Sequence, residues 1–160
     1  MEIIDPVDCP YYLITRTSLL ITSVLKKGFT SANIDQVKPA YLGVLMSLWR
    51  HEDSKKTTNK ISKNAELKIN ELARMVNLEP SSMTGLIDRM ERDGLIIRQA
   101  FPGDRRAQHI SLTENGHSVR ESVMKVVDET LTNIFRNISE DSLKSAKEVL
   151  RNVLANNQEI

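Results

Sequence analysis

Apolar residues recur at helical spacing along most of this chain. Between residues 11 and 27 they fall at positions 13, 14, 20, 21, 24 and 25, which share one face of a helix. Gly28 can end that helix, because glycine readily takes the left-handed conformation. A second helix is predicted for residues 38–51, where Pro39 suits the first turn and apolar residues form a stripe.

The stretch that follows, residues 52–66, is almost wholly polar and contains neither proline nor glycine. It has no periodic apolar face that could hold it against a core. We therefore predict a long loop there, with at most a fragment of helix.

Two short helices joined by a tight turn are predicted next. Residues 69–76 place apolar side chains at i, i+3, i+4 and i+7, and Asn77 can take the left-handed conformation that ends a helix. Pro80 then opens a second helix, which runs to about Gly94. The same apolar spacing recurs in this second helix at Met83, Leu86, Ile87 and Met90.

Two strands are predicted after these helices, at residues 95–101 and 107–112, on either side of Pro102 and Gly103. Proline and glycine favour a turn, so the two strands should form a hairpin. Two short helices followed by a hairpin are the order of a winged helix-turn-helix. The predicted fold class is therefore mainly α with a small β-hairpin wing.

Two further helices are predicted beyond the hairpin. One fits residues 114–137 with Thr113 as its N-cap, and the last follows the cap residue Ser139. These terminal helices are amphipathic and cannot close a core with one another alone, so their apolar faces need a second subunit. The expected domains are residues 1–36 with 114–160 as a helical dimerisation region, and residues 37–113 as the winged helix-turn-helix domain.

The polar face of the helix at residues 80–93 differs from that of an ordinary solvated helix. Its first two turns carry small uncharged side chains, where Lys and Glu would favour both helix and solubility. Short side chains let a helix enter a major groove, and hydroxyls can donate to phosphates or base edges. An ordinary capped helix start is the alternative. We expect the face to contact double-stranded DNA through Ser81, Ser82, Thr84, Gly85, Asp88 and Arg89.

Two adjacent arginines, Arg105 and Arg106, lie at the tip of the predicted hairpin. Guanidinium groups keep their charge, and a narrow minor groove has a strong negative potential. With the helix in the major groove, the tip is expected to reach the adjoining minor groove or backbone. Gly103 is expected to build the turn, and Asp104 to pair with Arg105 or Arg106. A plain surface turn is the alternative.

The chain of 160 residues is long enough for one domain with a sizeable core. Its net charge is only +1, but residues 55–110 carry 11 Lys and Arg against 7 Asp and Glu, which suits a polyanionic partner. No apolar run is long enough to cross a bilayer, and the N-terminus lacks the basic segment of a secretory signal. A cytoplasmic protein with no membrane partner is therefore expected.

Residues 67–116 resemble the DNA-binding core of the MarR family of bacterial transcription regulators. The matching motifs are ELA in the first short helix, SSMTGLIDRMERDGLI in the recognition helix, DRR in the wing and SLTENG at the start of the long helix. A weaker similarity extends to VKPAYLGVLMSLW and PYYLITRTSLL, so that the resemblance covers nearly the whole chain.

The resemblance implies a winged-helix homodimer whose first and last two helices interlock with those of a second subunit. It implies recognition helices in successive major grooves of a pseudo-palindrome, with wing arginines in the flanking minor grooves. Many members are repressors that small phenolic or aromatic-acid ligands release from DNA. Lys68 stands where the family commonly has a capping Thr or Ser, which places a cation near the DNA side. The polar stretch at residues 52–66 replaces the family's usually short link.

A pocket for a small aromatic ligand is one interpretation of the aromatic residues in the first half of the chain. Aromatic walls with one arginine suit an aromatic carboxylate. Packing in the core and dimer interface is the other interpretation. The residues concerned are Tyr11, Tyr12, Arg16, Met46 and Trp49.

The single cysteine, Cys9, lies just before the first helix and cannot form an internal disulfide. Some family members sense oxidants through cysteine, so an oxidant-sensing regulator is one alternative and an incidental cysteine the other. His51, His109 and His117 lack partners at metal-ligand spacing, and no catalytic constellation or nucleotide fingerprint is present. We expect no metal, no cofactor and no enzyme activity. A winged-helix module that binds protein through the same face remains the alternative function.

Overall fold

The structure is a computed structural model that describes residues 5–57, 67–101 and 104–156. It is mainly helical with one small antiparallel sheet, so the predicted fold class is confirmed. The elements in chain order are η1 (Pro6–Asp8), α1 (Pro10–Ser31), η2 (Pro39–Tyr41), α2 (Leu42–Thr57), β1 (Leu67–Lys68), α3 (Ile69–Met75), α4 (Pro80–Arg92), β2 (Ile96–Phe101), β3 (Asp104–Leu112), α5 (Glu114–Ser118), α6 (Arg120–Phe135) and α7 (Glu140–Asn156).

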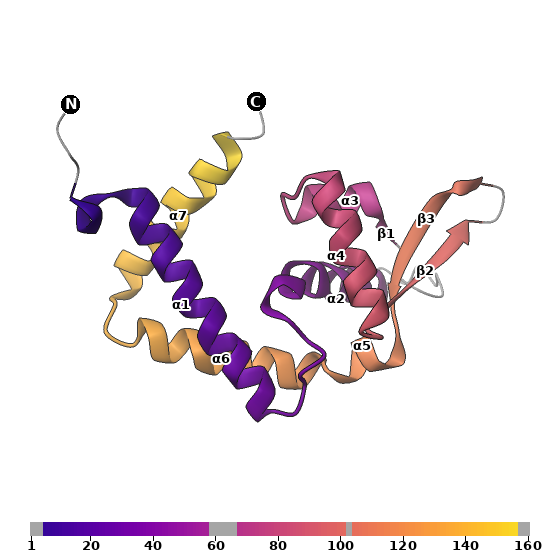
Figure 1. Ribbon diagram of the computed structural model, residues 1–160, viewed down its shortest axis with the longest axis horizontal. Coiled ribbons are helices and arrows are strands. Elements are labelled where there is room, and N and C mark those ends of the chain that lie inside the picture. Colours follow the sequence, from indigo (N-terminus) through magenta and orange to yellow (C-terminus); the bar gives the residue numbers. More distant parts are fainter. Residues whose placement is uncertain (1–4, 58–66, 102–103, 157–160) are drawn as a thin grey trace.

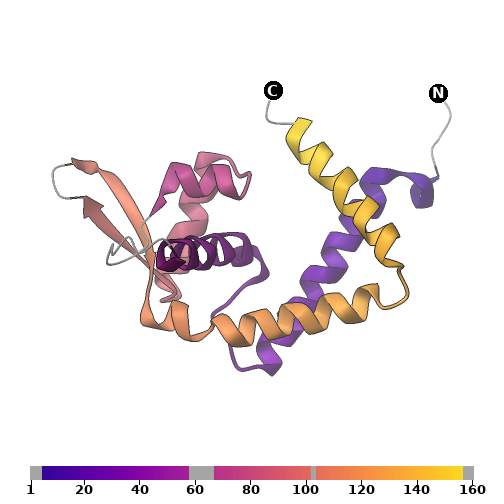
Figure 2. The ribbon, with the colours of Figure 1, turned by 180° about the vertical axis from the view of Figure 1, so that it is seen from behind.

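Helix α6 joins two groups of elements (Figure 1). On one side lie α2, α3, α4 and the sheet, and on the other α1 crosses α6 and α7 folds back from its end. The hairpin of β2 and β3 extends away from the helices, and the view from behind shows it at the far end of the molecule from α1 and α7 (Figure 2). The long axis of the molecule therefore runs from the terminal helices to the wing.

The core forms where the predicted apolar faces meet. On α4, Met83, Leu86, Ile87 and Met90 are each 4% exposed or less, as the periodicity predicted. They belong to one buried cluster with Leu95, which precedes β2, and with residues of α2, α3 and the sheet, among them Leu45, Leu48, Leu72, Ala73, Ile96 and Ile110. Asn77 and Gly94 have φ of 54° and 73°, so the predicted left-handed end of α3 is confirmed and a left-handed glycine follows α4.

The sheet has three strands in the order β1-β3-β2, one more than predicted. Strand β1 pairs Leu67 with Ile110 of β3 and is only two residues long, too short to produce an alternating pattern. Strand β3 begins at Asp104 rather than at residue 107. The backbone of Arg105 and Arg106 therefore belongs to the strand beside the turn and not to the turn itself.

Two predicted helix boundaries were wrong. Helix α1 continues through Gly28 to Ser31, because this glycine serves a close helix crossing: a Cβ added there would lie 2.6 Å from Cγ1 of Val126 on α6. Helix α2 continues to Thr57, so the first six residues of the polar stretch are helical and not loop. Their acidic side chains pair with α5 and α6, an interaction that apolar periodicity does not reveal. Residues 58–66 lie outside the described residues.

The helix predicted at residues 114–137 is divided into α5 and α6 at Val119. The buried indole Nε1 of Trp49 donates a hydrogen bond of 3.1 Å to the carbonyl of Gly116. In a continuous helix this carbonyl would be the acceptor for the N–H of Arg120. The caps were predicted correctly: the N–H of Gly116 donates to the hydroxyl of Thr113 at 3.0 Å, and Ser139 caps α7.

Candidate nucleic-acid interface

The outer face of α4 presents short side chains to solvent. Ser81, Ser82, Thr84, Asp88 and Arg89 are exposed, and Gly85 is half-buried. The Thr84 hydroxyl donates to the Pro80 carbonyl at 3.0 Å, which holds it close to the helix. A Cβ at Gly85 would meet only Nη1 of Arg89, at 3.7 Å. The side chains on the first two turns of α4 are therefore short enough for another surface to approach the helix backbone.

The second half of this face is fixed to the wing by Arg98 on β2. One guanidinium nitrogen of Arg98 bonds the carboxylate of Asp88, and the other lies 3.2 Å from the carboxylate of Glu91. Glu91 also accepts a hydrogen bond of 3.2 Å from the backbone N–H of Arg98. Asp88, predicted as a DNA contact, therefore has an internal partner. Sequence reasoning missed Arg98, although its charge in an otherwise apolar strand start was a signal.

The end of α4 is fixed by a hydrogen bond from the phenol of Tyr41. Its hydroxyl donates to Oδ2 of Asp93, the C-cap residue of α4, at 2.6 Å. Burial of the ring raises the pKa of Tyr41 to about 12, and the bond and charge of Asp93 act in the same direction. The orientation of α4 is thus tied both to the wing and to η2, which precedes α2.

Lys68 is exposed and occupies the N-cap of α3. A lysine has no side-chain acceptor, so it cannot cap; instead the carboxylate of Glu71 accepts the N–H of Lys68 at 2.8 Å. Of the predicted wing residues, Gly103 and the side chains of Asp104, Arg105 and Arg106 lie outside the described residues. Only the backbone of the last three is placed, at the start of β3.

Polar pairs join α2 to the helices that follow the wing. Asp53 accepts hydrogen bonds of 3.0 and 2.5 Å from the two Nη atoms of Arg120, and this pairing raises the pKa of Arg120. The Arg120 guanidinium also lies 5.9 Å from the centre of the Trp49 ring. Nδ1 of His117 lies 3.4 Å from the carboxylate of Glu52. We call these five residues the joint, because they connect α2 to α5 and α6.

The five residues predicted to line an aromatic-ligand pocket are not brought together within the chain. Tyr11 is 78% exposed in the first turn of α1, and Arg16 is exposed further along that helix. Trp49 is 2% exposed and belongs to the core, with half-buried Met46 one turn away on α2. The Trp49 ring, which was expected to form a wall of the pocket, thus packs in the core, and its indole N–H bonds the Gly116 carbonyl.

Cys9 is half-buried at the N-cap of α1, with a free thiol. The histidines lie on three elements, His51 on α2, His109 on β3 and His117 on α5. Burial lowers the pKa of His51, and nearby Lys55 adds to the effect. Among the residues that the structure describes, no group of three or more metal-ligating side chains occurs, and no helix is long and apolar enough to span a membrane.

Known proteins share the arrangement of helices and strands described above. Residues 40–107 match the family model described as the MarR family. CouR from Rhodococcus jostii RHA1, bound to p-coumaroyl-CoA, is 21% identical with a TM-score of 0.69, and the alignment covers 94% of each chain. Sco3205 from Streptomyces coelicolor, a MarR family regulator in complex with DNA, is 21% identical with a TM-score of 0.69 over 89% of this chain and 85% of its own. MOSR from M. tuberculosis, also in complex with DNA, is 14% identical with a TM-score of 0.73 over 95% and 98%.

Proposed function

The chain belongs to the MarR family and is a DNA-binding transcriptional regulator, and from this premise we propose that it acts as a homodimeric repressor with α4 as its recognition helix. The observation that carries the proposal is the exposed, short-chain face of α4 beside a projecting hairpin. The same architecture serves CouR, described as a transcriptional repressor bound to a 23-mer DNA duplex. Repression by this chain is our inference from that likeness.

Helix α4 is proposed to enter the major groove through its first two turns. Ser81 and Ser82 supply hydroxyls that can donate to phosphates or base edges, and Gly85 lets the helix backbone approach closely. Thr84, whose hydroxyl donates to the Pro80 carbonyl, can accept from a base amino group. Arg89 adds a cation further along the helix. Asp88 lies on the same face, and its bond to Arg98 also holds α4 at a fixed angle to the wing.

The wing is proposed to contact the minor groove or the flanking backbone through Arg105 and Arg106. Their position at the start of β3, next to the tip of a hairpin that extends away from the helices, supports this role. Lys68 on the N-cap of α3 adds a phosphate contact. The positions of α4 and the wing favour a protein in which each chain contacts one DNA half-site through one helix and one wing.

A second copy of the chain is proposed to cover the apolar faces of α1 and α7. No described residue of α7 is buried, although the helix carries several apolar side chains. Each of these is at least 45% exposed: Val149, Leu150, Val153 and Leu154. On α1, Tyr11, Leu13, Ile14, Leu19 and Leu20 are exposed as well. Apolar surface on this scale needs a partner, and a two-fold dimer would present two α4 helices to a pseudo-palindrome. Sedimentation at micromolar concentration should give a mass of twice 18.1 kDa, and a monomer would contradict the dimer.

A small-molecule effector is proposed to release the repressor from DNA. CouR is described in complex both with p-coumaroyl-CoA and with DNA, which supports ligand control in a protein of this fold. The aromatic pocket that the sequence suggests around Tyr11 and Trp49 does not form within one chain.

The function is tested by recovering the DNA that the purified full chain retains from fragmented genomic DNA of its source organism. We expect a few enriched fragments that share a pseudo-palindrome with half-sites one helical turn apart. A reporter placed behind such a fragment should be expressed more strongly when the gene for this protein is deleted. Retention of random fragments would contradict sequence-specific binding, and lower reporter expression after deletion would contradict repression.

The wing is tested by replacing Arg105 and Arg106 with alanine and measuring affinity for the recovered fragment over a range of salt concentrations. The plot of log affinity against log salt should become shallower by about one unit for each DNA phosphate that an arginine no longer neutralises. Lys144→Ala with Arg151→Ala removes the same charge from α7 and should leave the slope unchanged. Equal slopes for both double variants would contradict the proposed role of the wing arginines.

A further inference from the structure

The side chain of Arg89 lies back over the start of α4. Arg89 is exposed in the third turn of the helix, and its Nη1 lies 3.7 Å from the point that a Cβ on Gly85, one turn earlier, would occupy. Because Gly85 has no side chain, the guanidinium lies directly above the helix backbone. The positive charge is therefore presented on the first two turns of α4, the part of the helix that is proposed to approach DNA.

Only one neighbour of Arg89 along the helix can neutralise its charge. Side chains meet on a helix surface at spacings of three and four residues, which for Arg89 are positions 85, 86, 92 and 93. Gly85 has no side chain, Leu86 is buried and Arg92 is itself a cation. Asp93 is thus the one carboxylate at this spacing.

The carboxylate of Asp93 has other partners. Its Oδ2 accepts a hydrogen bond of 2.6 Å from the hydroxyl of Tyr41, and its Oδ1 lies 3.7 Å from Nε of Arg92. The carboxylate of Asp88 bonds the arginine of β2. Among the residues that the structure describes, none forms an ion pair with Arg89, so the five N–H donors of its guanidinium are available to another molecule.

Gly85 lies near the middle of the exposed face of α4. The buried side chains of the helix occupy the opposite side: Met83, Leu86, Ile87 and Met90. A helix in the major groove turns the middle of its exposed face toward the base edges, while the phosphates lie along its flanks. A guanidinium above Gly85 is therefore directed at base edges rather than at phosphates.

The donors of a guanidinium match the major-groove edge of one base. Guanine presents two neighbouring acceptors there, O6 and N7, and the forked N–H groups of an arginine can bond both. Adenine and cytosine present an amino donor in the same groove, and thymine presents a methyl group beside a single acceptor. Guanine is thus the base that offers Arg89 two acceptors at once.

We propose that Arg89 is a specificity-determining residue, which recognises one guanine in each half-site through hydrogen bonds to O6 and N7. Gly85 contributes through its lack of a side chain, and Tyr41 contributes by bonding the carboxylate of Asp93. The inference rests on the proposed function, since it requires α4 to lie in the major groove, and it adds the base that the helix selects. A phosphate contact, the other use of an exposed arginine, carries no base preference.

The guanine contact is tested on the fragment recovered from genomic DNA. Each guanine of the half-site is replaced in turn, in both half-sites, by 7-deazaguanine, which keeps O6 but lacks the N7 acceptor. We expect one position at which wild type loses at least about fivefold in affinity, and at which Arg89→Ala binds the natural and the substituted fragment equally. The proposal is overturned if that loss persists in Arg89→Ala, or if wild type shows no loss at any position.

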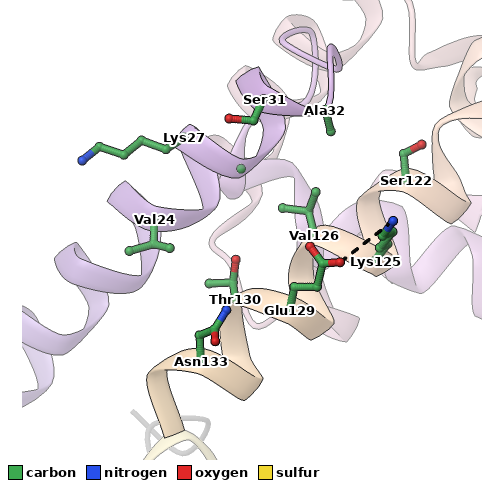
Figure 3. A pocket seen from close by; sticks show the side chains of 11 residues that line it. Val24, Lys27, Ser31, Ala32, Ser122, Lys125, Val126, Glu129, Thr130 and Asn133 are labelled. Atoms are coloured by element: carbon green, nitrogen blue, oxygen red, sulfur yellow. Dashed lines mark ion pairs between the residues drawn. The ribbon is translucent and has the colours of Figure 1, made fainter. Parts of the chain in front are cut away.

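Two variants remove one positive charge elsewhere and serve as controls. Arg92→Ala acts on the last turn of α4, next to Asp93. Lys125→Ala acts on α6, where the side chain of Lys125 lies 4.0 Å from Glu129 (Figure 3). Both variants should retain the full loss with 7-deazaguanine, whatever their overall affinity for DNA. Disappearance of the loss in Arg92→Ala as well would show a general effect of helix charge and overturn the contact by Arg89.

The outcomes distinguish a wrong base assignment from a wrong function. A recovered pseudo-palindrome without any G·C pair in its half-sites would overturn the guanine contact alone. So would a loss of affinity in Arg89→Ala that leaves the response to 7-deazaguanine unchanged, which is the result for a phosphate contact. Retention of random fragments would count against the proposed function, and with it against the guanine contact that depends on it.

Discussion

The two Nη atoms of Arg120 on α6 meet the carboxylate of Asp53 on α2 at 3.0 and 2.5 Å. The same guanidinium lies over the Trp49 ring, whose indole N–H bonds the carbonyl of Gly116. One residue of α6 therefore touches both the last described turns of α2 and the core. The joint thus holds α2 in position against α5 and α6.

Replacing Arg120 with glutamine should lower the free energy of unfolding by about 1 kcal/mol. Both partners are roughly half exposed, so the expected loss is that of a well-aligned surface pair plus the ring contact. Urea unfolding followed by circular dichroism measures this loss. Wild type and variant are compared at equal protein concentrations, because the stability of a dimer depends on concentration. Lys125→Gln, whose pair with Glu129 spans 4.0 Å on the same helix, should change stability little. Equal losses in the two variants would contradict a special role for Arg120.

Trp49→Phe should destabilise the protein by about 1–3 kcal/mol. Phenylalanine keeps an aromatic ring in the core but removes the indole N–H, which leaves the Gly116 carbonyl without that donor in a buried place. Because Trp49 is the one tryptophan of the chain, unfolding has to be followed by circular dichroism and not by its fluorescence. Stability equal to that of wild type would show that the bond across the break between α5 and α6 is dispensable.

Two glycines in helices should respond to alanine in opposite directions. Gly28→Ala forces a methyl group against Val126 and should cost about 1–3 kcal/mol. Gly85→Ala meets only Arg89, at 3.7 Å, and should stabilise α4 by about 0.5–1 kcal/mol because alanine favours helix. Thermal unfolding of both variants checks the pair. Destabilisation by Gly85→Ala would contradict the open surroundings of that residue.

The bond from Tyr41 to Asp93 should make stability depend on pH in the alkaline range. The pKa of Tyr41 is raised from about 10 to about 12, so the protonated phenol is favoured in the folded state. The contribution of the protonated Tyr41 phenol to the free energy of unfolding is therefore fully present below pH 10 and is lost as the pH rises through 12. The stability advantage of wild type over Tyr41→Phe should shrink by roughly 1 kcal/mol between pH 9 and pH 11 in urea unfolding. A constant difference across that range would contradict the raised pKa.

Apolar periodicity predicted the helices that have one buried face. Met83 and Met90 recur at the spacing that buries one side of α4, and the cap residues Thr113 and Ser139 were identified from their own chemistry. These features are local in sequence, so one window of residues contains all the information that they need.

Features that depend on distant partners were missed. Gly28 has the signature of a helix end, but its conformation is set by Val126, almost a hundred residues away. The break at Val119 coincides with the bond from Trp49 to Gly116, and the helical end of α2 with its pairs to α5 and α6. Arg98 gains its role only when β2 lies against α4. Residue type thus predicted which side chains of α4 are exposed, while it did not reveal Arg98, which orients that helix.

The central claim, that the exposed start of α4 meets DNA, is tested most directly by Ser82→Glu. A carboxylate at the third position of the helix favours the positive end of its dipole, so the fold should be as stable as wild type or more so. Ser142→Glu makes the same change at the third position of α7 and serves as the control. We predict that Ser82→Glu weakens binding to the recovered fragment at least about tenfold, through repulsion from DNA at both half-sites, while Ser142→Glu binds as wild type does. Wild-type affinity in a folded Ser82→Glu protein would contradict the assignment of α4 as the recognition helix.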